Sequence, residues 1–261
     1  MLHIFFLVLS QLAVGSFALL NLIPLPEIGK GFFRTCALLY LLLIALILAG
    51  LAWTRPAELL AFGLFFLLLV LYIASLWIER LPTSQRLLSI TSTVGILAVI
   101  ASAFSQPSAA ALTWETPLRA LNFLCSALSL GAAMTGMMLG HWYLVTPELS
   151  LIPIKRLTGL LLGSLVVQGG LLTLVLVPEL GAVPAALLPK VNHLLLAYPY
   201  FLLGRVVVGL VGTFGLAGLT LWLLREGSTQ AATGFLYTAV LTVTVGELIA
   251  RFLFHLSGVP V

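Results

Sequence analysis

Eight long apolar stretches run through the 261-residue sequence and constrain its fold more than any other feature. A transmembrane helix needs about 20 apolar residues, and each stretch is close to that length or longer. Charges and prolines collect in the short segments between them, as they do in membrane loops. We therefore predict an all-α, polytopic membrane protein with eight transmembrane helices, over residues 2–22, 32–53, 58–78, 87–104, 118–145, 157–177, 196–224 and 231–256.

The charge content excludes most other classes of protein. Only 8% of the residues are charged, whereas a soluble domain carries about 25%, so the chain lacks the polar surface needed to face water on all sides. Soluble enzymes and nucleic-acid-binding modules are excluded. The longest run of adjacent basic residues is the pair Lys155-Arg156, so we expect membrane lipid, and no nucleic acid, around the chain.

The Pro- and small-residue-rich segment 105–117 divides the chain into two four-helix halves, 1–105 and 118–261, which form two four-helix bundles within one membrane domain. An even number of spans places both termini on one side. Basic residues favour one set of alternate loops, so the positive-inside rule predicts non-cytoplasmic termini and a multi-pass protein of the inner (cytoplasmic) membrane. The richer set is Lys30, Arg34, Arg80, Arg86, Lys155, Arg156 and Arg225; the poorer set is Arg55, Arg119 and Lys190.

A few ionisable residues fall inside the apolar stretches, where they are costly and therefore point to function. Glu247, Arg251 and His255 recur every four residues and share one stripe of the last helix, in the order that favours a Glu–Arg pair. Glu247 lies about 14 Å from the end of that helix, near the middle of the membrane. Arg205 reaches a comparable depth on the preceding antiparallel helix, close enough for a bidentate contact. A pair that only neutralises itself is the alternative.

Histidine, arginine and glutamate thus converge on the outer half of the membrane, and this combination suits a quinone. A quinone headgroup needs hydrogen-bond donors at its carbonyls and a titratable group to move protons. We predict Arg205, Arg251, His193 and Tyr198 as quinone-binding residues, with Glu247 and His255 moving protons; an apolar cleft would hold the tail. The cysteines, Cys36 and Cys125, lie on different helices, so we expect no disulfide. We also expect no haem or metal in this chain.

Stripes of small residues mark the second half of the chain and predict close helix packing. One stripe repeats every four residues and the other every three: Ala132, Gly136 and Gly140, then Gly209, Gly212, Gly215 and Gly218.

Several short motifs resemble one family of membrane proteins. They are LVLSQLAVGSF at 7–17, TRP at 54–56, GMMLG at 136–140, Arg205, and above all GELIARFLF at 246–254. The chain is similar to the membrane-anchor subunits of dimethyl sulfoxide reductase and their polysulfide- and nitrite-reductase relatives. The resemblance implies eight helices, outer termini and oxidation of menaquinone- or ubiquinone-type quinol near the outer face. It also implies an iron–sulfur or multihaem cytochrome partner subunit on that face, with a molybdopterin catalytic subunit beyond it.

Two departures from that family keep other functions open. The family's histidine before the helix-two proline is absent from the stretch Leu51-Ala52-Trp53. The acidic residue on the family's third helix is also absent, because residues 62–78 carry no charge. A purely structural membrane anchor with a vestigial quinone site is therefore one alternative. A small-solute transporter is the other, although Pro199 falls only in a first helical turn, where proline is tolerated. In the leading interpretation the chain is not catalytic alone and hands electrons to its partner.

Overall fold

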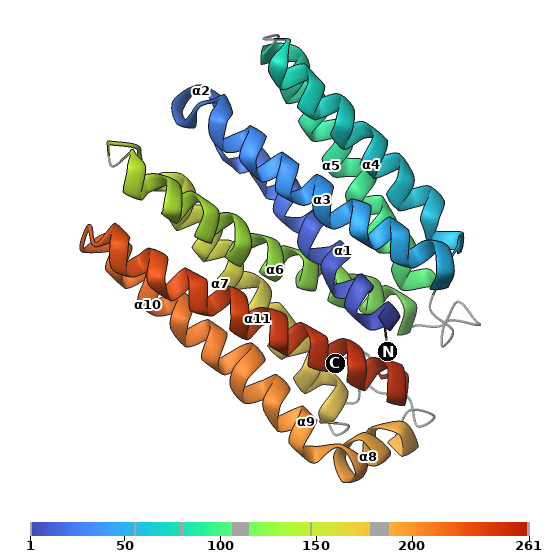
Figure 1. Cartoon of the computed structure of the whole chain (residues 1–261). Coiled ribbons are helices and arrows are strands. Elements are labelled where there is room, and N and C mark those ends of the chain that lie inside the picture. Colours follow the sequence, from blue (N-terminus) through green and yellow to red (C-terminus); the bar gives the residue numbers. More distant parts are fainter. Residues whose placement is uncertain are drawn as a thin grey trace.

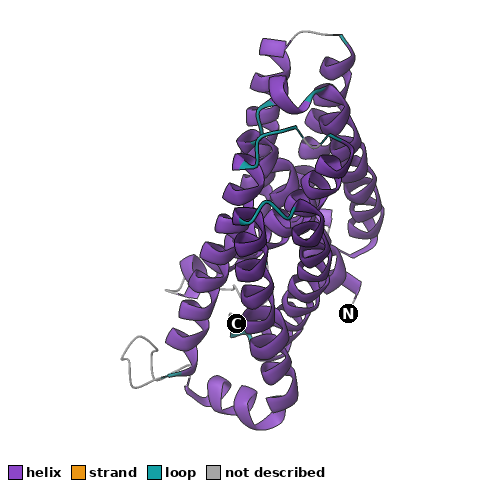
Figure 2. Cartoon of the chain, turned by 90° about the vertical axis from the view of Figure 1, so that its left-hand side faces the viewer, coloured by secondary structure: helices purple, strands orange, loops and turns teal. Residues whose placement is uncertain are grey.

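The computed structural model describes residues 2–54, 56–78, 81–105, 115–146, 148–177 and 188–259. Within this part of the chain every regular element is helical (Figure 2). Eight helical segments are long and apolar enough to cross a membrane, which confirms the predicted number. The long helices are α1 (Leu2–Leu19), α3 (Lys30–Thr54), α4 (Pro56–Trp77), α5 (Leu81–Phe104), α6 (Glu115–Val145), α7 (Ile152–Leu176), α10 (Thr213–Arg225) and α11 (Thr229–Ser257).

Shorter helices complete the chain. The 3₁₀ turn η1 (Leu20–Leu22) extends the first span, and α2 (Leu25–Ile28) precedes α3. The seventh span combines α9 (Pro199–Gly204), a π-helical segment η5 (Arg205–Gly212) and α10. This span begins at Pro199 and not at residue 196, because the helix is interrupted at Tyr198. The short helix α8 (Leu188–Ala197) ends before Tyr198, and α9 begins after it. Proline lacks the N–H that a continuous helix would need there.

The two halves each form a four-helix bundle (Figure 1). In the first half α1, α3, α4 and α5 pack around one another, and in the second α6, α7, α10 and α11 do so. The halves are joined where α1 packs along α6, with further contacts from α1 to α11 and from α5 to α6. Consequently α1 and α6 are the central helices of the molecule.

The central position of α1 and α6 matches the location of the buried polar side chains. Ser10 and Gln11 on α1 and Asn122 and Ser126 on α6 are almost completely buried, whereas outer positions such as Leu60 are exposed to lipid. Because hydrocarbon offers no hydrogen bonds, polar groups on a spanning helix turn toward protein. The helices that carry most of them therefore occupy the centre.

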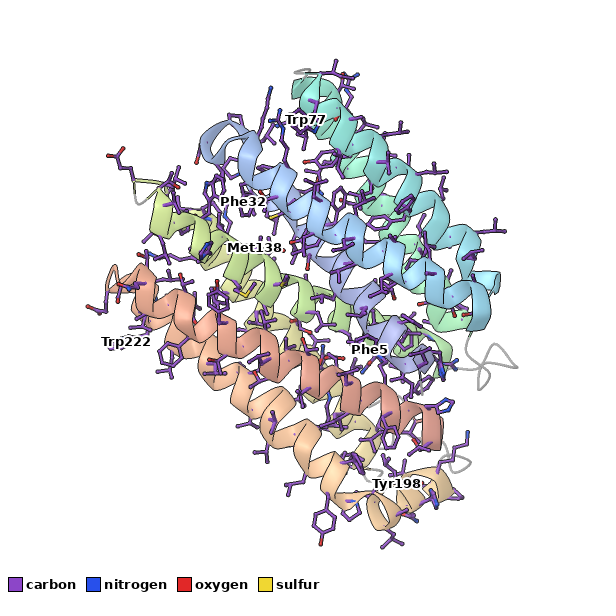
Figure 3. All side chains as sticks on the ribbon, in the orientation of Figure 1. Phe5, Phe32, Trp77, Met138, Tyr198 and Trp222 are labelled. Atoms are coloured by element: carbon purple, nitrogen blue, oxygen red, sulfur yellow. The ribbon has the colours of Figure 1, made fainter. Side chains whose placement is uncertain are left out.

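Both chain ends lie at the same end of the bundle, together with α8 (Figure 1). The rings of His3 and His255 are 4.7 Å apart there. We call this the terminal end, and the opposite end, with α2 and the turn at 226–228, the loop end. Trp77 and Trp222 lie toward the loop end (Figure 3). The predicted cation-rich face corresponds to the loop end; Arg55 and Arg80, which were also counted in the prediction, lie outside the described residues. Which end faces the cytoplasm stays a prediction.

Candidate functional site

Glu247 is fully buried on α11, and three side chains contact its carboxylate. Arg205 donates from Nη1 to Oε1 at 3.2 Å, and Ser126 donates from Oγ to Oε2 at 2.6 Å. Arg251, one turn further along α11, places Nη2 3.7 Å from Oε2. The predicted meeting of Arg205, Glu247 and Arg251 is therefore confirmed.

Arg251 donates hydrogen bonds to side chains of both α1 and α6. Its Nη1 donates to Asn122 Oδ1 at 2.8 Å, its Nη2 donates to Ser126 Oγ, and its Nε donates to Gln11 Oε1 at 3.4 Å. The guanidinium also lies 4.0 Å from the centre of the Phe123 ring, a cation–π contact. The planar guanidinium thus has a different partner for each of its nitrogens.

Arg205 reaches the same cluster from the seventh span. Its Nη1 contacts Glu247 while its Nη2 donates to Gln168 Oε1 on α7 at 2.6 Å. Gln168 in turn donates to Ser129 Oγ at 3.1 Å. The expected bidentate contact is wrong, because Gln168 takes the second arm of the guanidinium.

Local backbone structure brings Arg205 to Glu247. Arg205 opens the π-helical segment η5, and wider helical turns of this kind recur at functional sites. Gly209 and Gly246 let η5 and α11 approach so closely that a Cβ on Gly209 would lie 2.6 Å from Gly246 Cα. The same Cβ would lie 3.3 Å from Arg205 Nη1. The two glycines therefore provide the space in which the arginine reaches the carboxylate.

We call these residues the buried polar cluster: Gln11, Asn122, Ser126, Ser129, Gln168, Arg205, Glu247 and Arg251. Two arginines face one carboxylate, so the cluster carries an excess of positive charge. Arg205 Nε and Gln11 Nε2 are buried without a hydrogen-bond partner. The four larger cavities described for this part of the chain are lined by neither Glu247 nor Arg205.

A small void adjoins the cluster at Arg251. It measures about 10 Å³, close to the room that one water molecule needs. The rings of His3 and His255 meet edge to face beside it. We call this the histidine corner, lined by His3, Ile4, Leu7, Arg251, Phe254 and His255.

An apolar groove of about 270 Å³ runs along the next face of α11. Ile4 lines both the groove and the histidine corner, so the two adjoin at this side chain. Figure 3 shows Phe5, which also lines the groove, near the terminal end of α1. The groove residues are Ile4, Phe5, Phe201, Leu248, Ile249 and Phe252.

The structure does not bring His193 and Tyr198 to the cluster. Their rings pack on each other, 5.8 Å apart, at the junction of α8 and α9, where Figure 3 shows Tyr198 at the edge of the second bundle. Because the helix is interrupted before Pro199, α8 does not continue the axis of the seventh span, and His193 on α8 lies away from the cluster. His255 instead pairs with His3.

Sequence reasoning missed the neutral polar residues of the cluster and one cation. The sequence singles out Gln11 only within a family motif, and the charge count places Arg119 among the basic residues of the loops. Arg119 is in fact buried, 5.5 Å from the centre of the Phe254 ring. A signal existed on α6, because Asn122, Ser126 and Ser129 recur at helical spacing on one face.

No protein-family model, curated protein or solved structure matches the chain. The resemblance seen in the sequence therefore rests on its motifs alone. Within the described residues no group of three His, Cys or Glu side chains is placed to hold a metal ion, and Cys36 and Cys125 are buried and free. The chemistry that this arrangement can support is hydrogen bonding and charge stabilisation by Arg251, and proton transfer at His3 and His255.

Proposed function

We propose that the chain is a quinone-interacting membrane-anchor subunit of an oxidoreductase complex in the inner membrane. The observation that carries the proposal is the histidine corner beside the apolar groove. The groove opens to lipid and suits an isoprenoid tail, while His3, His255 and Arg251 offer polar groups directly behind Ile4. Amphiphilic cofactors bind where an apolar cleft meets a few fixed polar groups.

The residues take roles that follow from their positions. Arg251 is fixed by Asn122, Ser126 and Gln11, so it presents a rigid positive charge toward the corner. Oxidation of a quinol to a quinone releases two electrons and two protons. His255 is exposed to the surroundings, so it accepts the two protons one after the other and passes each outward, with His3 beside it. Glu247 and Arg205 are sealed from the void and position Arg251 without touching the quinone. A headgroup is larger than the void, so Ile4 must rotate away when it enters.

Electrons leave toward a partner subunit on the terminal end. The histidine corner lies at that end, so a quinol bound there is close to a docked iron–sulfur or multihaem cytochrome subunit, with a molybdopterin subunit beyond it. Such a transfer needs no redox centre in the chain itself.

The test compares two exposed histidines at the same end of the bundle. His255→Gln should weaken binding of a short-chain quinone analogue to the purified chain and slow quinol-dependent reduction of the partner in the assembled complex. His193→Gln, whose ring packs on Tyr198, is the matched control and should retain both. Equal binding and turnover in the two variants would show that the corner takes no part. Ile4→Trp, which fills the groove mouth, should abolish analogue binding while the complex still assembles.

A structural membrane anchor is the second candidate, and the hydrogen bonding within the buried polar cluster favours it. Glu247 and each hydrogen-bonding arm of Arg251 have partners from neighbouring helices, as a lock between helices requires. In that case extraction of the purified complex should yield no quinone, and Ile4→Trp should leave turnover unchanged. Solute flux in proteoliposomes without any redox partner would instead favour a transporter.

A further inference from the structure

A second apolar groove, larger than the one at the terminal end, lies between the two bundles. It measures about 420 Å³. Its floor is formed by α1 and α6, through small residues such as Gly15, Ala18 and Ala127. Its walls are Ile96 and Val99 from α5 and Leu160 from α7. Both helices pack against α6, and α7 lies behind α6 in Figure 1.

The groove ends at a polar cavity of about 440 Å³ at the loop end. This cavity contains one cation and one anion, Arg156 at the start of α7 and Glu27 on α2. Neutral polar groups complete the lining, from Gln85 on α5 and Ser150 before α7. Arg156 and Glu27 are both exposed, so the cavity is open to the membrane surface.

Asn21 and Leu22 line both the groove and the cavity and therefore connect them. The Asn21 side chain is fixed in place: Nδ2 donates to Ala18 O and to Ser92 Oγ, each at 2.9 Å, and Oδ1 accepts from Ser89 Oγ at 2.9 Å. The junction is thus tied to α5 and keeps its shape. A single ligand with an apolar tail and a polar head fits this order of surfaces.

We propose that the groove and cavity form a binding site for a phospholipid with an ethanolamine head. Arg156 binds the phosphate, because a guanidinium matches phosphate oxygens with two hydrogen bonds. Glu27 accepts hydrogen bonds from the primary ammonium. One of its two acyl chains lies along Ala18 and Leu160. This site uses neither the histidine corner nor the buried polar cluster, so it does not rest on the proposed redox function.

The depth of the groove agrees with a lipid of one leaflet. From Leu22 to Val14 the groove follows eight residue-to-residue steps of helix, or about 12 Å. Half of a hydrocarbon core is about 15 Å. An acyl chain that starts at the polar cavity therefore reaches the membrane midplane where the groove closes.

The test is native mass spectrometry of the full chain in detergent with one added lipid at a time. Phosphatidylethanolamine should remain bound more than phosphatidylcholine, whose quaternary ammonium has no N–H, and more than the anionic phosphatidylglycerol. Arg156→Gln leaves a neutral amide donor in place of the guanidinium and should reduce the retained lipid roughly tenfold, the loss expected for one of the two charge-assisted hydrogen bonds. Glu27→Gln should remove only the preference for the ethanolamine head.

Matched variants separate the site from general surface effects. Arg225→Gln and Glu226→Gln change exposed charges at the same end outside the cavity and should leave binding as in the wild type. Ala18→Phe and Leu160→Trp fill the groove from two sides and should each block retention, whereas Leu42→Phe, on the lipid-facing side of α3, should not. Equal retention of the three lipids would overturn the proposal, as would wild-type retention in Arg156→Gln or in both groove-filling variants.

Discussion

Arg205 and Glu247 join the seventh and eighth spans through a 3.2 Å contact between Nη1 and Oε1, at the level where Gly209 and Gly246 bring the two backbones together. Both side chains are almost completely buried. Around them five spans contribute hydrogen bonds, through Gln11, Ser126 and Gln168 as well as the pair itself. A polar centre of this kind fixes how the spans are rotated against one another, because any other rotation leaves charges in hydrocarbon.

Glu247→Gln should destabilise the protein strongly. The change leaves Arg205 and Arg251 buried without a counter-charge, and breaking one partner of a buried ion pair costs about 3–5 kcal/mol. The free energy of unfolding, measured by titration from mild detergent into dodecyl sulfate, should fall accordingly. Glu226→Gln, at an exposed turn, should change it little.

Replacing the whole charged set tests the cause of that loss. Arg205→Met combined with Glu247→Met and Arg251→Met removes the charges together, and apolar replacement of a buried ionic set is often neutral or stabilising. The triple variant should therefore be more stable than Glu247→Gln alone. The opposite order would mean that the hydrogen bonds, and not the charge balance, dominate the cluster.

Gly209→Ala should loosen the contact between η5 and α11. Its new Cβ would lie 2.6 Å from Gly246 Cα, so the helices must separate and Arg205 must move from Glu247. Overpacking of this kind costs about 1–3 kcal/mol. Gly218→Ala, which meets no atom within 4 Å, is the control and should keep the wild-type thermal midpoint. Equal midpoints for the two variants would contradict the close approach.

The sequence predicts what depends on local pattern. Apolar length alone locates the spans, and spacing of four residues alone pairs Glu247 with Arg251. The depth of Arg205 could also be estimated, because adjacent antiparallel helices cross the same membrane. These features can be predicted without knowing how distant helices are rotated against one another.

The remainder of the site depends on contacts between distant helices. That Gln11 meets Arg251, and that His3 meets His255, follows from α1 lying against α6 and α11, which no periodicity indicates. The packing predicted for the second glycine stripe is confirmed at Gly209 but wrong at Gly215 and Gly218, which face open space. A stripe of small residues does not reveal which of its members meets another helix.

Arg251→Lys should not be a conservative change. The guanidinium donates to Asn122, Ser126 and Gln11 in different directions, and one ammonium cannot reach all three from the same position. Leaving a buried polar group unsatisfied costs about 1–3 kcal/mol. The thermal midpoint in detergent should fall well below that of Arg225→Lys, a change at an exposed arginine. A lysine variant as stable as the wild type would show that charge alone matters at this position.

Labelling of single cysteines from the two sides of the membrane should reveal the orientation of the bundle. Cys36 and Cys125 are buried, so the native chain should react little with an impermeant maleimide, and introduced cysteines supply the signal. Asn192→Cys on α8 and Gln230→Cys at the start of α11 are exposed at opposite ends.

The basic residues decide which of these two positions should be labelled in intact cells. Six basic residues belong to helices that start or finish at the loop end: Lys30, Arg34, Arg86, Lys155, Arg156 and Arg225. The positive-inside rule therefore predicts that this end faces the cytoplasm. Asn192→Cys should react from outside, and Gln230→Cys only after the membrane is opened. The reverse pattern would place the histidine corner in the cytoplasmic half, and a partner subunit would then have to dock from the cytoplasm.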